Sequence, residues 1–274
     1  MMEMVALLHG LALILYIVAA GVLVRTLAGA RPRAPQGGPV VLAAAVLAHG
    51  AALAAYAVVN GELPLVGLAP SLSVFGFLTA TFLLAVALFR EARTLGLVLL
   101  PLVALLLVVA LALGIRPSGE ALVFRGPWLY LHVILAFIGY AGLAVAFAAG
   151  LVYLLQFREL KVKRLGRVFR FFPSLDTLDV VGRRALAIGF AALSIALVLG
   201  WAWTVRFQNS FAIGEPDVVW GIVTWFTFLA VIAARVGDPA RGRRGAMASV
   251  VGFAVVVLVY MVLRLNGAGG TAFL

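Results

Sequence analysis

Apolar residues occur in eight long runs, and the shorter segments between and beyond the runs contain all the charged residues and every proline except Pro101. Each run is close to the roughly 20 residues that a helix needs to cross the hydrocarbon core of a bilayer. The runs lack the alternation of barrel strands, and amides in lipid must be hydrogen-bonded within the segment. The pattern therefore predicts an all-α fold, a polytopic transmembrane helical bundle of about eight spans. The runs are 5–24, 40–59, 72–89, 95–113, 128–155, 185–205, 218–234 and 246–263.

The composition indicates that lipid is the solvent for this fold. Hydrophobic residues make up 65% of the chain and charged residues 11%, far below the roughly 25% charged share of a soluble domain. We expect one integrated bundle with an N-terminal four-helix half, residues 1–115, and a C-terminal four-helix half, residues 116–274. We expect this multi-pass protein in the inner (cytoplasmic) membrane of the cell.

Lysine and arginine residues predict the orientation. All but four of the 21 lie in alternate connections between the runs, which the positive-inside rule places in the cytoplasm, so both termini are expected outside. The first run is interpreted as a retained span, because it has no basic residue before it and Arg25 follows it. The net charge of +11 does not predict a nucleic-acid partner, since the basic residues lie between apolar runs. The four exceptions are Arg116, Arg125, Arg206 and Arg264.

Three connections have features of their own. Residues 157–184 are strongly basic, and Pro173-Ser174 predicts the start of a short helix with Leu175, Leu178 and Val181 at helical spacing. We expect this helix to lie along the cytoplasmic interface, with a solvated basic loop as the alternative. The outer connections 60–71 and 206–217 are irregular and partly apolar, so we expect them to fold onto the mouth of the bundle.

Few residues inside the apolar runs can carry chemistry. All ten carboxylates fall in connections or at span ends, which disfavours an ion-driven transporter. There is no cysteine, so a thiolate metal site and covalent haem attachment are excluded. The sequence contains no nucleophile–base pair, phosphate loop or metal cluster of recognisable spacing, and we expect a protein that is not an enzyme.

Histidine is the ionisable residue that remains inside the spans, as His9, His49 and His132. A tyrosine follows each at helical spacing: Tyr16, Tyr56 and Tyr140. Neutral imidazole, aromatic walls and rim arginines together suit a non-covalent haem b. We predict His132 and His49 as iron ligands and His9 as a further candidate, with Tyr140 and Trp128 as walls and Arg125 and Arg206 near the propionates. The alternative is that each histidine makes one interhelical hydrogen bond.

Four blocks in order resemble the haem-handling cytochrome c assembly domain shared by CcsA-like and CcmC-like proteins. The resemblance covers about residues 128–260 and implies a role in handling haem. The blocks are Pro127-Trp-Leu-Tyr-Leu-His-Val133 with Gly139-Tyr140, Pro173-Ser-Leu-Asp-Thr-Leu-Asp179 with Gly189-Phe190, Trp220-Gly-Ile-Val-Thr-Trp225, and Arg241-Gly-Arg-Arg244 with Tyr260.

The chain departs from the haem exporters of that family at three places. Their tryptophan-rich outer loop corresponds here to residues 211–216, which contain no tryptophan. Their two later histidines correspond to Ala233 and to the tail 266–274, so only His132 remains. The first half, with Leu72-Ser-Val74 and residues 95–101, looks most like the HemX-like branch, which implies His49 as the partner of His132.

These observations lead to a haem-binding or haem-handling membrane protein related to cytochrome c biogenesis. The expected partners are the lipid bilayer, haem, and proteins of cytochrome c assembly or haem biosynthesis. The alternative is a non-catalytic scaffold or regulator of haem biosynthesis that acts through the basic connection 157–184. A permease for an apolar small molecule stays open, although nothing in the sequence points to one.

Overall fold

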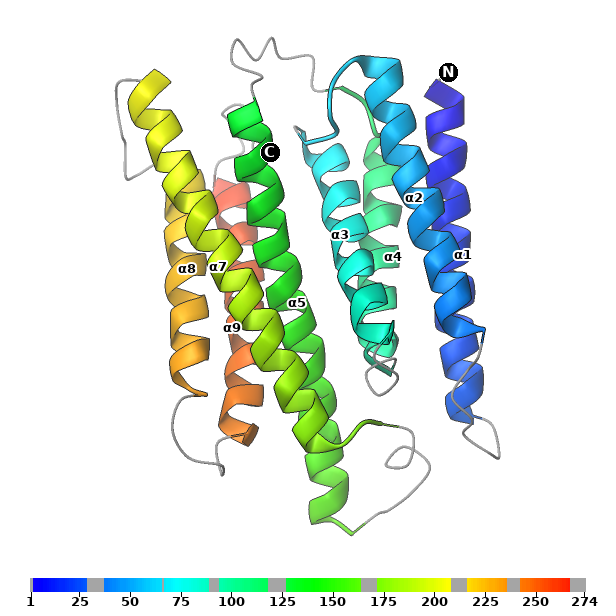
Figure 1. Ribbon diagram of the computed structural model, residues 1–274, viewed down its shortest axis with the longest axis vertical. Helices are drawn as coiled ribbons and strands as arrows, with labels where there is room; N and C mark the ends of the chain where they lie inside the picture. Colours follow the sequence, from blue (N-terminus) through cyan, green and yellow to red (C-terminus); the bar gives the residue numbers. More distant parts are fainter. Residues whose placement is uncertain are drawn as a thin grey trace.

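The computed structural model describes residues 2–28, 37–65, 67–88, 94–117, 127–163, 172–207, 216–235 and 242–266, and these contain long helices and no strand. The all-α prediction is thereby confirmed. The helices run side by side with their axes nearly parallel, and only α7 crosses its neighbours obliquely (Figure 1). They are α1 (Met2–Ala28), α2 (Gly38–Asn60), α3 (Leu68–Leu88), α4 (Gly96–Leu113), α5 (Pro127–Lys161), α7 (Leu175–Phe207), α8 (Pro216–Ala233) and α9 (Gly242–Asn266).

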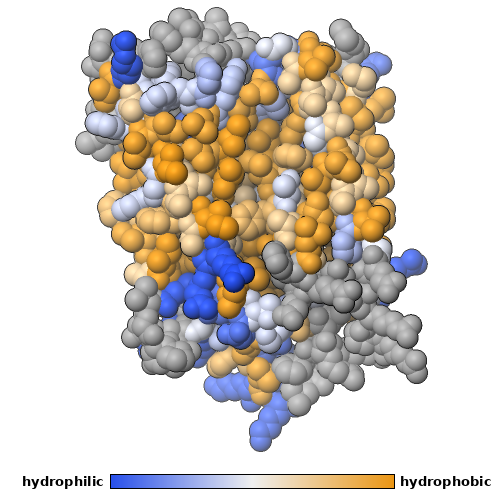
Figure 2. Space-filling model, in the orientation of Figure 1, coloured by the Kyte–Doolittle hydropathy of each residue, from blue (hydrophilic) through white to orange (hydrophobic). Residues whose placement is uncertain are grey.

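Seven of the described helices are long and apolar enough to cross a membrane. The other helix, α8, is apolar over Val218–Ala233 but shorter. Its 18 residues give a length of about 27 Å, slightly less than the roughly 30 Å of a hydrocarbon core. Hydrophobic side chains cover the middle of the molecule, and hydrophilic ones gather toward its ends (Figure 2). The chain is therefore a multi-pass membrane protein.

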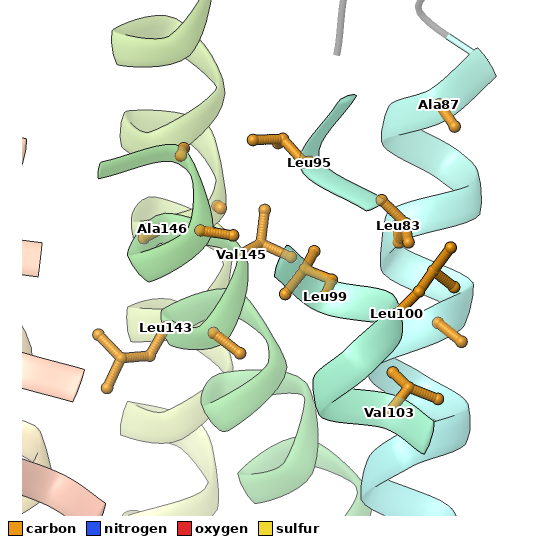
Figure 3. Packing of buried hydrophobic residues seen from close by; sticks show 14 of the residues in the cluster. Leu83, Ala87, Leu95, Leu99, Leu100, Val103, Leu143, Val145 and Ala146 are labelled. Atoms are coloured by element: carbon orange, nitrogen blue, oxygen red, sulfur yellow. The ribbon is translucent and has the colours of Figure 1, made fainter. Parts of the chain in front are cut away.

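The helices form two groups that meet along α5. Helices α1 to α4 pack on one another, and α5, α7, α8 and α9 form the second group. Helix α5 joins them through α3 and, to a smaller extent, α4. Figure 3 shows this junction: Val145 of α5 points toward Leu99 of α4, whereas Leu143 points away from α4. All three side chains are buried in the largest apolar cluster of the protein.

Glycines bring α5 and α7 into direct backbone contact. A Cβ atom on Gly142 of α5 would lie 2.6 Å from the carbonyl oxygen of Ala185 of α7, and one on Gly139 would lie 3.2 Å from that of Gly189. Small residues at such positions let membrane helices approach closely. The resulting contact between α5 and α7 is the most extensive helix pairing in the chain.

The expected short interfacial helix after Pro173 does not exist as a separate element. The Ser174 hydroxyl accepts a hydrogen bond from the Thr177 amide at 3.2 Å and caps a helix, as the sequence indicates. That helix, however, continues without a break from Leu175 to Phe207. The expectation was wrong because Leu178, which is 1% exposed, packs into the bundle core instead of facing the interface.

One outer connection folds as expected. Leu65 is buried against Val74 of α3 and against Val133 and Phe137 of α5, so the segment after α2 covers the junction of the two groups. The other outer connection lies largely outside the described residues.

The two ends of the bundle differ in charge. Helix α1 begins and α9 ends at the same end of the bundle (Figure 1), the end at which α7 places Arg206. We name the opposite end the basic end; its described basic residues include Arg25, Arg158, Lys161, Lys163, Arg183, Arg184, Arg235, Arg243 and Arg244.

Candidate functional site

Two of the three histidines lie together in the first helix group. His9 of α1 and His49 of α2 are fully buried, and their ring centroids are 5.5 Å apart. Their Nε2 atoms lie 3.0 and 2.9 Å from one oxygen, Oγ of Ser73 on α3. Tyr16 of α1 extends this cluster, with its hydroxyl 3.2 Å from Nδ1 of His49. Three helices therefore share one buried polar cluster.

The proton positions in this cluster follow from the contact between His9 and the Val5 carbonyl oxygen. His9 Nδ1 lies 2.7 Å from the carbonyl oxygen of Val5, and a carbonyl only accepts, so Nδ1 carries the proton. Neutral His9 then accepts from the Ser73 hydroxyl, and Ser73 accepts from His49 Nε2–H. His49 Nδ1 accepts from Tyr16. With both rings neutral, every ring nitrogen of His9 and His49 is hydrogen-bonded.

His132 stands apart from this cluster, in the second helix group. Its Nδ1 lies 2.7 Å from the carbonyl oxygen of Ala196 on α7 and must donate to it. Nε2 is therefore the unprotonated nitrogen of the neutral ring, and it has no hydrogen-bond partner among the described residues. A neutral imidazole whose outer N–H is held by a carbonyl is the usual arrangement of a metal-ligating histidine.

The surroundings of His132 come from α5 and α7. A Cβ atom on Gly200 would lie 2.7 Å from Cε1 of His132, so glycine at this position leaves room for the ring. One turn before His132, the indole of Trp128 donates to the carbonyl oxygen of Leu199 at 2.9 Å. Trp128 is 46% exposed. The two side chains thus bind neighbouring turns of α7, beside an exposed aromatic surface.

The other predicted pocket residues do not gather around His132. Tyr140 stacks on Trp220 of α8 at a centroid distance of 4.5 Å and meets Phe75 of α3 edge-on at 6.5 Å. Arg206 is exposed in the last turn of α7. Arg125 lies outside the described residues.

The predicted pairing of His49 with His132 finds no support in the contacts of either ring. His49 meets α1 and α3, through His9, Tyr16, Ser73 and Phe77. His132 meets α7. Of the tyrosines that follow the first two histidines at helical spacing, Tyr16 bonds His49 of the neighbouring helix, and Tyr56 donates to Glu62 at 3.2 Å.

A polar site at the basic end was not anticipated from the sequence. Arg235, in the turn after α8, donates to Asp179 of α7 at 2.8 Å and to Ser249 of α9 at 2.7 Å. The arginine side chain is only 7% exposed, and Gly182 and Gly245 pack directly against it. Burial lowers the pKa of the Arg235 guanidinium, and the Asp179 carboxylate opposes that shift. This ion pair ties three helices together, and Asp179 within the Pro173 block was the available signal.

Comparisons with known proteins agree on one relationship. The family model described as "Cytochrome C assembly protein" matches residues 38–269. The chain is 29% identical to the cytochrome c biogenesis protein CcsA of Synechococcus elongatus, over 86% of each chain. It is 26% identical to CcsA of Guillardia theta over 53% of each chain. It is 33% identical to CcsA of Nostoc punctiforme, over 34% of this chain and 27% of the relative.

Proposed function

The chain belongs to the cytochrome c assembly family, and we propose that it serves cytochrome c biogenesis by binding haem through His132. The observation that carries this proposal is the state of the His132 ring. Its Nδ1–H is held by the Ala196 carbonyl and its Nε2 has no hydrogen-bond partner in the described part of the chain. Neutral imidazole with a free Nε2 is the form that ligates haem iron.

The residues near His132 fit a flat apolar group with a polar rim. Trp128 at 46% exposure, Leu131 at 50% and Trp201 at 55% leave an open apolar surface at this end of α5 and α7. Arg206 lies exposed at the end of α7 and Arg125 precedes α5 in sequence, and these two arginines are the candidates for the propionate rim. Haem b would be held without covalent attachment, because the chain has no cysteine. Binding and orienting haem require no catalytic group, so the proposed role is non-enzymatic.

The proposed orientation follows from charge. The described basic residues are concentrated at the basic end, which the positive-inside rule assigns to the cytoplasm. Both termini, Trp128 and His132 then lie toward the outer face of the inner membrane. The proposed haem site is therefore in the outer half of the bundle.

The direct test is a haem titration of the detergent-purified protein, followed by absorption spectroscopy. We expect a Soret band for the wild type and its loss in His132→Ala. Leu105→Ala is the control, because the Leu105 side chain is 59% exposed on α4, in the other helix group, and should leave the band unchanged. A His132→Ala variant that bound haem with wild-type affinity would contradict the proposal.

A second candidate function, recruitment of a cytoplasmic enzyme of haem biosynthesis, is favoured by the length of α5. This helix extends beyond its neighbours at the basic end (Figure 1), where Arg158, Lys161 and Lys163 are exposed. Such a helix end could attract an acidic protein surface. The test is a pull-down with all three residues replaced by glutamine; retention of every partner would count against this function.

A further inference from the structure

The hydrogen-bond partners of the imidazole nitrogens show which of these nitrogens could bind a metal. The sequence contains three histidines, each with two ring nitrogens, and all three lie in the described helices. Both nitrogens of His9 and both of His49 are hydrogen-bonded. Nδ1 of His132 is also hydrogen-bonded, to Ala196. Nε2 of His132 is thus the single imidazole nitrogen available to a metal.

Using His9 or His49 as a second iron ligand would break the hydrogen bonds that join these histidines to Ser73 and Tyr16. His9, His49, Ser73 and Tyr16 all have 0% exposure, so water cannot replace a lost partner. Withdrawing His49 would leave the Ser73 and Tyr16 hydroxyls with one bond fewer inside the membrane. Each buried polar group left unpaired costs about 1–3 kcal/mol. The cluster therefore retains its histidines.

The described helices offer few other strong axial donors. The chain has no cysteine, and the side chains of Met4, Met247 and Met261 are 46–50% exposed on the bundle surface. Lys161, at the far end of α5, is roughly 44 Å along the helix from His132. A haem that His132 ligates thus finds no second histidine or cysteine ligand on its other face.

From these hydrogen bonds we propose that the protein gives haem iron a single histidine ligand, His132. The opposite axial position is then open to an imidazole of the polypeptide that receives the haem. This inference rests on the proposed haem binding through His132. One axial bond from the carrier lets the acceptor bind the free face before the carrier releases the iron. A carrier with two axial histidines would have to release one before the acceptor could bind.

The test uses the wild-type holoprotein in detergent and needs no variant that must fold. Ferric holoprotein should be high-spin by absorption and electron paramagnetic resonance, and free imidazole as the probe should convert it to a low-spin species. Ferrous holoprotein should bind carbon monoxide immediately. A low-spin wild-type spectrum that imidazole leaves unchanged would overturn the single-ligand inference while leaving haem binding intact. Absence of any Soret band would overturn both proposals.

Variants of the three histidines test which of them ligates the iron. His49→Phe and His9→Phe should keep the wild-type spin state, because neither ring contributes to the iron. His132→Gly leaves space for a small ligand, so added imidazole should restore the Soret band that this variant loses. A wild-type holoprotein whose spectrum changed from low-spin to high-spin on His49→Phe would identify His49 as a ligand and contradict the inference.

Discussion

The two histidine environments of this protein differ in whether every ring nitrogen has a hydrogen-bond partner. In the first helix group, His9 and His49 share Ser73, and every ring nitrogen has a partner. In the second group, His132 has one nitrogen held by Ala196 and one without a hydrogen-bond partner among the described residues. A closed network in lipid holds helices together, whereas an incomplete one can accept a ligand. The same residue type therefore joins helices in the first group and, in our proposal, binds a ligand in the second.

The ion pair between Arg235 and Asp179 lies in the second helix group, away from His132, and we expect it to contribute to stability alone. Arg235→Ala removes the buried partner of Asp179, which keeps only the exposed Arg183 at 3.2 Å, and removing one member of a buried ion pair costs up to about 3–5 kcal/mol. We expect the largest loss of thermal stability here, measured by unfolding in detergent, with unchanged haem affinity in protein that stays folded. The exposed Arg184→Ala is the control. Loss of haem binding by folded Arg235→Ala protein would contradict the separation of roles.

The closed histidine cluster is tested most directly at Ser73. Ser73→Ala removes two interhelical hydrogen bonds, and such bonds contribute about 0.6–1.7 kcal/mol each in membrane proteins, so we expect a loss of about 1–3 kcal/mol. Ser71→Ala is the matched control, because the Ser71 hydroxyl bonds only the Leu65 carbonyl, at 3.3 Å. The measurement is thermal unfolding of both variants. Equal stability of the two would show that the cluster contributes nothing.

The open site is tested at the glycine beside His132. In Gly200→Ala the new methyl group would lie 2.7 Å from Cε1 of the ring, so the imidazole must leave its position. A displacement costing about 1.4 kcal/mol corresponds to an affinity about tenfold weaker for haem. Gly10→Ala is the control, since nothing lies within 4 Å of its added Cβ atom. An unchanged haem dissociation constant in Gly200→Ala would contradict the placement of the ligand.

The smallest expected effect is that of Trp128. Trp128→Phe keeps an aromatic ring and removes the hydrogen bond to Leu199, worth about 0.6 kcal/mol in a membrane protein. We therefore expect a small loss of stability and nearly unchanged haem affinity, measured on the same preparation. A large loss of haem binding would instead indicate that the indole N–H contacts the haem.

The helices were predictable from the sequence because lipid offers no hydrogen-bond partners to the backbone of a spanning segment. A run such as 40–59 must satisfy its amides within the segment, and α2 extends from Gly38 to Asn60. Helix ends were less predictable: α7 begins ten residues before the apolar run 185–205, since Leu178 finds a place in the core. Burial of that leucine depends on neighbouring helices, which a local pattern does not contain.

The sequence by itself determined the fold class, the three histidines and the likeness to the cytochrome c assembly family. Only the tertiary structure decided which imidazole nitrogens are occupied. Nothing in the sequence predicts that Ser73 lies beside a histidine, yet it joins His9 and His49 across separations of 64 and 24 residues. Its position depends on how α1, α2 and α3 are rotated about their axes, and that rotation is set by side-chain packing over the whole bundle. For the same reason His132, on the α5 face that meets α7, retains a free nitrogen.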